Sequence, residues 1–151
     1  MLNKKFIMSL EVKKLDSPEE AEAVRLLRTR VFVDEQGVPS ELEVDEFDDT
    51  AVHAVAYKSG VVVGTGRLIL DTPTDARIGR MAVEASHRRN GLGSAILAFL
   101  ENEARSQGAR RLNLHAQHYA KDFYAKYSYC ECGDTFIEAG ILHVEMTKDI
   151  A

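Results

Sequence analysis

The stretch at residues 87–94 constrains this chain more than any other part of its 151 residues. It reads His-Arg-Arg-Asn-Gly-Leu-Gly-Ser and lies between a strand-like run (residues 77–83) and a strongly helical run (residues 95–107). Gly91 and Gly93 can adopt a positive φ and let another group approach the backbone closely. The first N–H groups of the following helix have no partner within the helix and lie at the positive end of its dipole. The pattern therefore predicts a strand, a loop that binds an anion such as pyrophosphate, and a helix.

Alternating and helical patterns predict the other elements. After a short strand at residues 9–15, Ser17 is an expected N-cap, with Pro18 at the first helical position and Glu20 completing a capping box. The helix that they start is expected to run to about Val33. The remaining expected elements are a hairpin (52–58 and 61–70), a turn (71–75), a strand (111–114), a helix (120–127) and a final hairpin (129–136 and 141–147). Strands first and then β-α-β-α-β predict an α/β fold, with a mixed sheet and helices on both faces.

Composition limits what the chain can bind. Its length predicts one domain over residues 1–151, with residues 1–7 as an extension in front of it. The formal charge of −5 argues against non-specific binding of nucleic acid. No apolar stretch approaches the roughly 20 residues of a membrane span, and no signal-peptide pattern is present. Cys130 and Cys132 are expected to be reduced thiols of a cytoplasmic protein, and no metal site is predicted.

Several motifs together resemble one family of enzymes. The glycine motif and a later tyrosine motif are similar to the acyl-CoA-binding core of the GNAT acetyltransferase superfamily. The front and the end of the chain resemble the narrower ElaA/YjcF-like branch of that superfamily. The motifs that carry the resemblance are Arg88-x-x-Gly91-x-Gly93, Gln117-x-x-Ala120-x-x-x-Tyr124 with Tyr129, residues 30–39, residues 45–48 with His53, and residues 136–143.

The resemblance implies a site for acetyl-CoA. GNAT domains have a mixed, mostly antiparallel sheet in which the strand before the glycine loop splays from the strand after the helix, and the thioester arm lies between them. Met81, Ala82 and Val83 would then pair with pantetheine through their backbone, as an added strand would. The further residues that the resemblance assigns to acetyl-CoA are Arg88, Arg89, Asn90, Gly91, Leu92, Gly93, Ser94 and Gln117. Two positions depart from the family pattern, because Gln117 replaces an Asn and Ser128 replaces a Gly that ends a helix.

Tyr124 is the expected general acid. The resemblance places it where GNAT enzymes commonly carry a tyrosine that protonates the departing CoA thiolate. Plain helix packing is the alternative, and it explains Phe123 and Tyr127 better. The acceptor amine must lose a proton before it attacks, and residues 77–83 contain no acid that could take it. Glu35 or Glu46 is predicted to be the base or part of the acceptor site, with Glu138, His118 and His143 as further candidates.

An acidic segment at residues 34–49 carries eight carboxylates and no Lys or Arg. The simplest interpretation is a solvated loop. The alternative is an ordered lid over the acceptor side of the cleft, where a cluster of carboxylates would attract a cationic amine. Phe32, Val38 and Phe47 lie in or beside this segment and favour the ordered lid.

These observations predict an acetyl-CoA-dependent N-acetyltransferase that transfers the acetyl group directly to a primary amine, preferably of a small molecule. A covalent cysteine intermediate is not expected, because both cysteines lie in a strand far from the glycine motif. A non-catalytic acyl-CoA-binding or regulatory module and a protein N-acetyltransferase stay open as alternatives. The expected partners are acetyl-CoA and an amine acceptor, without metal, nucleic acid or membrane, and the protein is expected to be a monomer or a homodimer.

Overall fold

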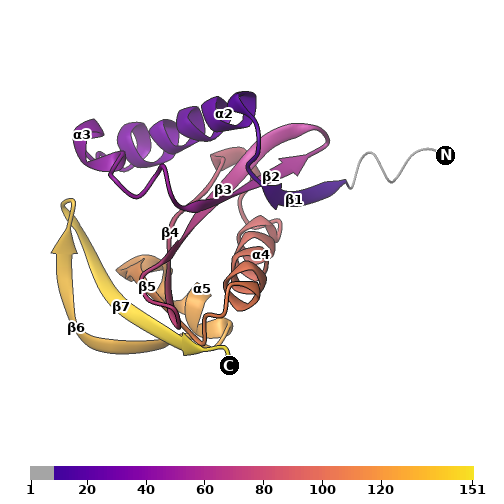
Figure 1. Cartoon of the computed structure of the whole chain (residues 1–151). Helices are drawn as coiled ribbons and strands as arrows, with labels where there is room; N and C mark the ends of the chain where they lie inside the picture. Colours follow the sequence, from indigo (N-terminus) through magenta and orange to yellow (C-terminus); the bar gives the residue numbers. More distant parts are fainter. Residues whose placement is uncertain (1–8) are drawn as a thin grey trace.

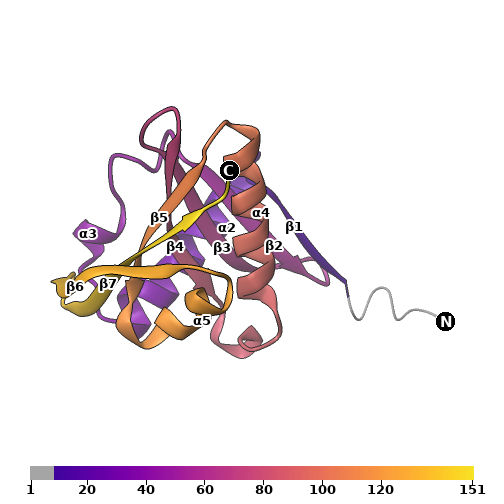
Figure 2. The same ribbon diagram turned by 90° about the horizontal axis from the view of Figure 1, so that it is seen from below.

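The computed structural model describes residues 9–151 and has one seven-stranded sheet with helices on both faces (Figures 1 and 2). The order of the strands is β1-β2-β3-β4-β5-β7-β6, and all neighbours are antiparallel except β4 and β5. The predicted α/β fold with a mixed, mostly antiparallel sheet is confirmed; the expected extension at residues 1–7 lies outside the described residues. The strands are β1 (Leu10–Lys14), β2 (Val52–Lys58), β3 (Val61–Leu70), β4 (Asp75–Val83), β5 (Arg111–Gln117), β6 (Cys130–Glu138) and β7 (Ile141–Asp149).

The parallel strands β4 and β5 pair over only part of their length. Their pairing runs from Asp75 opposite Arg111 to Ile78 opposite Leu114, and within the described chain the later residues of the two strands are not paired with each other. On its other side β4 stays paired with β3, across a bulge at which Arg80 has a φ of 53°. The far half of β4 therefore has a strand partner on one edge and none on the edge toward β5, which is the splay that the resemblance implied.

Helices cover the sheet on both sides. In Figures 1 and 2, α2 lies on one face, and α4 and α5 lie on the other. The helices are α2 (Pro18–Arg28), the π-helix η1 (Thr29–Glu35), α3 (Ser40–Glu43), α4 (Leu92–Ser106), α5 (Lys121–Lys126) and the short 3₁₀ turns η2 (Ala85–His87) and η3 (His118–Ala120). Among residues 9–151 no helix is long and apolar enough to cross a membrane.

Each face of the sheet has its own hydrophobic core. On the α4 side, the side chains of Ile96 and Leu100 are fully buried and pack against strand residues such as Leu114. On the α2 side, a smaller cluster consists of Leu27, Val31, Phe32 and Ala82. Burial of apolar side chains on both faces holds the helices against the sheet.

The first helix begins as predicted but changes type before its end. The Ser17 side chain accepts a hydrogen bond from the Glu20 N–H at 3.1 Å, whereas the Glu20 carboxylate accepts from the N–H of Asp16 instead of Ser17. The α-helix ends at Arg28 and continues as the π-helix, so the expected regular helix to Val33 is wrong. A π-turn inserts one extra residue into a helix, and the spacing of apolar residues does not reveal this.

Other boundaries shift by a few residues, as is usual for helix and strand ends. The helix after the glycine loop begins at Leu92 rather than at residue 95, and β5 continues to Gln117. The last hairpin forms from β6 and β7, and both strands extend two residues beyond the ends expected from the sequence. The longer β5 brings Gln117 to the place where β4 and β5 diverge.

Candidate active site

The glycine loop has the backbone that its sequence predicts. Gly91 is the N-cap of α4 and has a φ of 82°, in the left-handed region. A Cβ at Gly91 would meet no atom within 4 Å, so the backbone conformation is the reason for glycine there. At Gly93, a Cβ would lie 3.3 Å from the ring of Phe123, so packing is the reason for glycine at that position. Arg89, two residues before Gly91, also has a positive φ, of 67°.

A groove of about 500 Å³ lies between this loop and α5. Most of the residues that the resemblance assigned to acetyl-CoA line it, whereas Asn90 is exposed outside its wall. Lys126 adds a cation from α5 that the sequence reasoning missed, because it is 35 positions from Gly91 in the chain (126 − 91). The residues that line the groove are Val83, His87, Arg88, Arg89, Gly91, Leu92, Gly93, Ser94, Phe123, Lys126 and Tyr127.

The side chain of Arg88 is turned toward the protein. Its Nη1 and Nη2 donate to the two carboxylate oxygens of Glu35 at 2.6 and 2.8 Å, and its Nε donates to the carbonyl oxygen of Val83 at 2.9 Å. The guanidinium thus links the glycine loop to the π-helix. The anion donors that remain at the groove are the N–H groups of the first turn of α4, Arg89 and Lys126.

A second cavity, of about 450 Å³, opens where β4 and β5 diverge. Met81, Gln117 and Tyr124, three of the residues that the resemblance assigned to the site, line it. Ala82 does not: its side chain is buried in the core on the α2 side, and its backbone lies opposite Thr65 of β3. The walls of the cavity come from the segment at residues 32–45, from β3, β4 and β5, and from the turn between β6 and β7.

Gln117 is hydrogen-bonded to another residue of the cavity wall. Its Nε2 donates to Oε1 of Gln36, which follows the π-helix, at 2.8 Å. This contact holds the amide at the strand end in place, and it was not predictable because 81 positions separate the two residues. An amide can donate and accept at the same time, so Gln117 retains an oxygen for a further contact.

Tyr124 lies in an aromatic cluster at the base of the cavity. Its ring makes edge contacts with Phe123 at 5.0 Å and with Tyr129 at 5.9 Å between centroids. Burial raises the pKa of the Tyr124 hydroxyl above its ordinary value, so the phenol stays protonated at neutral pH. The expected packing role of Phe123 and Tyr127 agrees with their contacts, since both pack against the main core. Tyr124 is thus a partly buried, protonated phenol in the cavity wall.

Arginine side chains form ion pairs with part of the acidic segment. Arg28 donates from Nε to Glu43 at 2.6 Å and from Nη1 to Asp48 at 2.7 Å. Arg67 donates from Nη1 to Asp45 at 2.7 Å and to Asp48 at 3.0 Å. For these three carboxylates the expectation of a solvated loop is wrong, because each has partners on elements that the sequence does not place beside it.

Arg80 completes this network at the cavity wall. Its Nε donates to the Glu43 carbonyl oxygen at 3.0 Å, and its Nη2 lies 3.3 Å from Oδ2 of Asp45. Burial, together with the positive charges of Arg67 and Arg28, lowers the pKa of Arg80 below its ordinary value. Three arginines therefore face three carboxylates, so this part of the segment is an ordered cover with little of the unpaired negative charge that the lid hypothesis assumed. The carboxylates of the segment that stay exposed and outside this network include Asp34, Glu41, Glu46 and Asp49.

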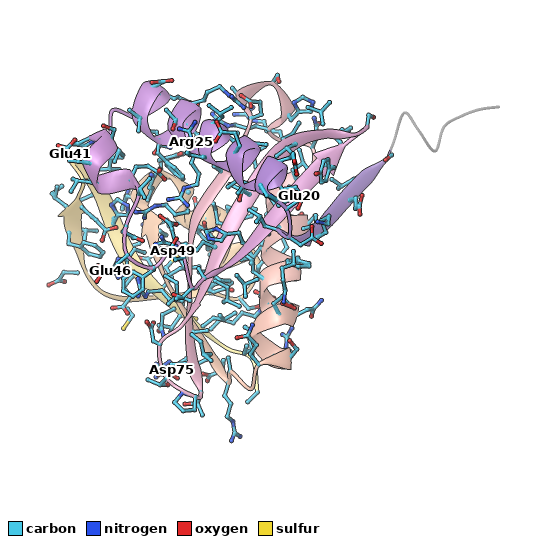
Figure 3. All side chains as sticks on the ribbon, turned by 45° about the horizontal axis from the view of Figure 1, so that its top comes forward. Glu20, Arg25, Glu41, Glu46, Asp49 and Asp75 are labelled. Carbon is cyan, nitrogen blue, oxygen red and sulfur yellow. The ribbon has the colours of Figure 1, made fainter. Side chains whose placement is uncertain are left out.

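The predicted bases lie at different places. Glu35 is paired with Arg88, and Glu46 is exposed on the segment between α3 and β2 (Figure 3); neither lines the cavity. His118 lies in η3, outside the cavity wall. Glu138 and His143, in contrast, both line the cavity. The assignment of Glu35 or Glu46 stays a prediction from sequence, and the geometry offers other residues for the role.

The chain belongs to the GNAT acetyltransferase family. The model of the acetyltransferase (GNAT) domain family, Acetyltransf_10, matches residues 15–150. The uncharacterized N-acetyltransferase YjcF of Bacillus subtilis is 39% identical over 124 residues, which are 82% of this chain and 88% of that protein. The family match and the similarity to YjcF together show that the protein is an acyltransferase.

Solved structures agree with this assignment. The crystal structure of Escherichia coli ElaA matches with a TM-score of 0.82 and 25% identity, over 93% of this chain and 99% of that chain. An aminoglycoside 6'-N-acetyltransferase complexed with coenzyme A matches with a TM-score of 0.76 over 92% of this chain and 96% of that chain. At 20% identity the second likeness concerns the fold alone.

Proposed function

We propose that the protein is an acetyl-CoA-dependent N-acetyltransferase that acts on a primary amine of a small molecule. The observation that carries this proposal is the splay of β4 and β5, with a cationic groove at the glycine loop and a cavity lined by Tyr124. Val83 borders the groove and Met81 borders the cavity, so one strand edge connects the two spaces.

The groove fits a pyrophosphate. The open space at Gly91 and the first N–H groups of α4 suit close approach of an anion, and Arg89 and Lys126 supply positive charge. The unpaired edge of β4, from Gly79 to Val83, would hold the pantetheine arm by strand-like hydrogen bonds. The thioester would then lie in the cavity beside Tyr124.

The reaction would proceed by direct attack of the amine nitrogen on the thioester carbon. Holding the two reactants side by side supplies much of the rate. Backbone N–H groups at the bulge of β4 would stabilise the oxyanion of the tetrahedral intermediate. When the C–S bond breaks, the Tyr124 hydroxyl would protonate the CoA thiolate.

The cavity wall indicates which amines suit it. Three carboxylates and three arginines line it, so it offers little net charge to attract a cation. Apolar side chains fill much of the remaining wall and favour an amine with an apolar body: Phe32, Val38, Leu42, Ile69, Met81 and Ile141.

The two cysteines are exposed and unbridged, which fits a protein of the reducing cytoplasm. We propose that it acts there as a monomer or a homodimer, without a metal.

The test of this function is release of CoA from acetyl-CoA over a panel of amines. The panel contains arylalkylamines, polyamines, amino sugars, amino acids and peptides with free N-termini. We expect release that depends on the acceptor and is fastest with small amines that carry an apolar group. A protein that binds acetyl-CoA but releases no CoA with any amine would be a binding module, and peptides as the best acceptors would identify a protein N-acetyltransferase.

Replacing Gly91 with valine should weaken CoA binding at least about tenfold, or about 1.4 kcal/mol. A β-branched residue cannot easily adopt the left-handed conformation of Gly91, and its methyl groups would fill the space open to phosphate. Titration calorimetry with CoA measures the effect. Gly37→Val is the matched control, because Gly37 also has a positive φ and open space, but lies outside the groove. Equal CoA affinity of Gly91→Val and Gly37→Val would exclude the loop as the phosphate site.

A further inference from the structure

His143 borders the cavity from the middle of the β5-β7-β6 part of the sheet. It lies opposite Gln117 of β5 on one side and opposite Phe136 of β6 on the other, so the three side chains share one face. His143 is 6% exposed, and it lines the same cavity as Tyr124. An imidazole and a phenol therefore border one space from different elements.

A hydrogen bond fixes which ring nitrogen of His143 carries a proton. Nδ1 lies 2.7 Å from the carbonyl oxygen of Ile141. A carbonyl oxygen only accepts, so Nδ1 must donate, and in the neutral ring Nε2 then has the lone pair. Phe136 stacks on the imidazole, with 5.8 Å between centroids and 21° between the planes, and restricts its rotation. His143 thus has an oriented ring whose Nε2 is not used by the strand or the turn.

We infer that His143 is the general base of the acetyl transfer. This inference rests on the proposed function. Nε2 takes one proton from the acceptor ammonium, R–NH₃⁺, and the ring becomes an imidazolium. The lone pair that is released attacks the thioester carbon, the C–S bond breaks, and the thiolate takes the proton of Tyr124. The nitrogen of the intermediate loses its second proton to the tyrosinate through water, and the imidazolium releases its proton to water, so that the product is a neutral amide and the site returns to its starting state.

The carboxylates around the cavity are occupied by other partners. Glu43 and Asp45 accept from arginines, as described above, and Glu138 lies 2.9 Å from Nδ1 of His115. Burial would raise the pKa of Asp45, but hydrogen bonds and nearby positive charge, chiefly from Arg67, outweigh it and lower that pKa, so this carboxylate is a weaker base. His143 makes its hydrogen bond to a neutral carbonyl and does not share its ring with a carboxylate.

His115 is the rival of His143 for this role. It also lines the cavity, and its Nε2 is the ring nitrogen not used by Glu138. Its side chain is 40% exposed, however, whereas His143 is buried. His143 is the more deeply buried of the two, so an acceptor amine in the cavity reaches it with less bulk water between them, which favours His143. Both histidines contact Phe136, His115 edge-on from β5 and His143 by stacking from β7, so each can be replaced separately.

The tautomer can be tested without an acceptor. Long-range ¹H–¹⁵N spectra of the histidine rings distinguish a ring with its proton on Nδ1 from one with its proton on Nε2. We expect the neutral ring of His143 to carry the proton on Nδ1, with the signals assigned by comparison with His143→Asn. A neutral ring protonated on Nε2 would overturn the inference, whether or not the protein transfers acetyl groups.

Kinetics with amines of different basicity tests the proton transfer. Asparagine at position 143 keeps an N–H near the position of Nδ1 and lacks the base. With phenethylamine, which is an ammonium ion at neutral pH, kcat/KM of His143→Asn should fall by about 10²-fold. With β,β-difluorophenethylamine, which is largely the free amine at mildly alkaline pH, the loss should be less than about fivefold, since little proton removal is needed. His115→Asn, the matched variant, should change both rates by the same factor.

Each outcome has one meaning. Equal losses of His143→Asn with the two amines would show that His143 only supports the fold, and a difference confined to His115→Asn would give the role to His115. Either result overturns the inference and leaves the proposed function intact, because the wild-type protein still transfers acetyl groups. A wild-type protein that acetylates neither these amines nor any other of the panel overturns both.

Discussion

Tyr124→Phe should lower kcat by about 10²-fold and leave the affinity for acetyl-CoA nearly unchanged. The substitution keeps the ring, and with it the edge contacts to Phe123 and Tyr129, and removes only the hydroxyl. Because burial raises the pKa of Tyr124, this hydroxyl is protonated at every pH at which the amine can react. Its loss would leave the CoA thiolate to depart without a proton donor. Steady-state kinetics with the best amine of the panel, and calorimetry with CoA, measure the two effects.

Tyr129→Phe is the control for the loss of a buried hydroxyl from the same aromatic cluster. Tyr129 donates to Glu101 at 2.8 Å, on the core side, and does not line the cavity. Glu101 keeps Lys148 as a partner, so the variant should lose about 1 kcal/mol of stability and retain its kcat. A Tyr124→Phe enzyme with the kcat of the wild type would make Tyr124 a packing residue.

Local features of the fold could be predicted because their causes are local. Ser17 has the extended conformation typical of an N-cap, and Gly91 has the left-handed conformation that glycine adopts without strain. Ser128 has a φ of 76°, the left-handed conformation in which the family pattern has glycine. In each case one residue and its neighbours determine the backbone, so the printed sequence contains the information. The glycine loop and the element order follow from such signals.

Contacts between distant segments could not be predicted. Arg88 and Glu35 are separated by 53 positions, and Gln117 and Gln36 by 81, so no periodicity relates them. The acidic segment shows the consequence: its composition suggested solvent or a cationic substrate, whereas arginines on α2, β3 and β4 pair with three of its carboxylates. The net charge of a segment predicts the charge of a site only when the charged residues that pair with that segment are known. For the same reason, the sequence alone does not choose among the candidate bases.

Arg28→Ala should destabilise the protein by about 3–5 kcal/mol, the usual effect of removing one partner from a buried ion pair. The side chains of Arg28 and Glu43 are 6% and 4% exposed, so the variant removes the closest cation from a carboxylate in a place that water hardly reaches. Glu43 then keeps Arg80 at 3.4 Å as its remaining cation. The loss of attachment would also loosen the cover over the cavity. Arg25→Ala, one turn earlier on α2, is the control: its pair with Glu22 is exposed and should contribute at most about 0.5 kcal/mol.

The pH dependence of the difference in unfolding free energy between the wild type and Arg28→Ala gives a second measurement. Burial alone would raise the pKa of Asp48, but hydrogen bonds from Arg28 and from the Asp45 N–H outweigh it and hold that pKa well below its usual range. A carboxylate with a lowered pKa in the folded state stabilises the fold above its unfolded pKa, and this contribution is lost as the pH falls toward the folded pKa. The difference between the wild type and Arg28→Ala should therefore be largest at neutral pH and shrink below about pH 4. Urea unfolding at neutral and acid pH measures it; a difference at neutral pH as small as that of Arg25→Ala would mean that the arginine network does not hold the cover in place.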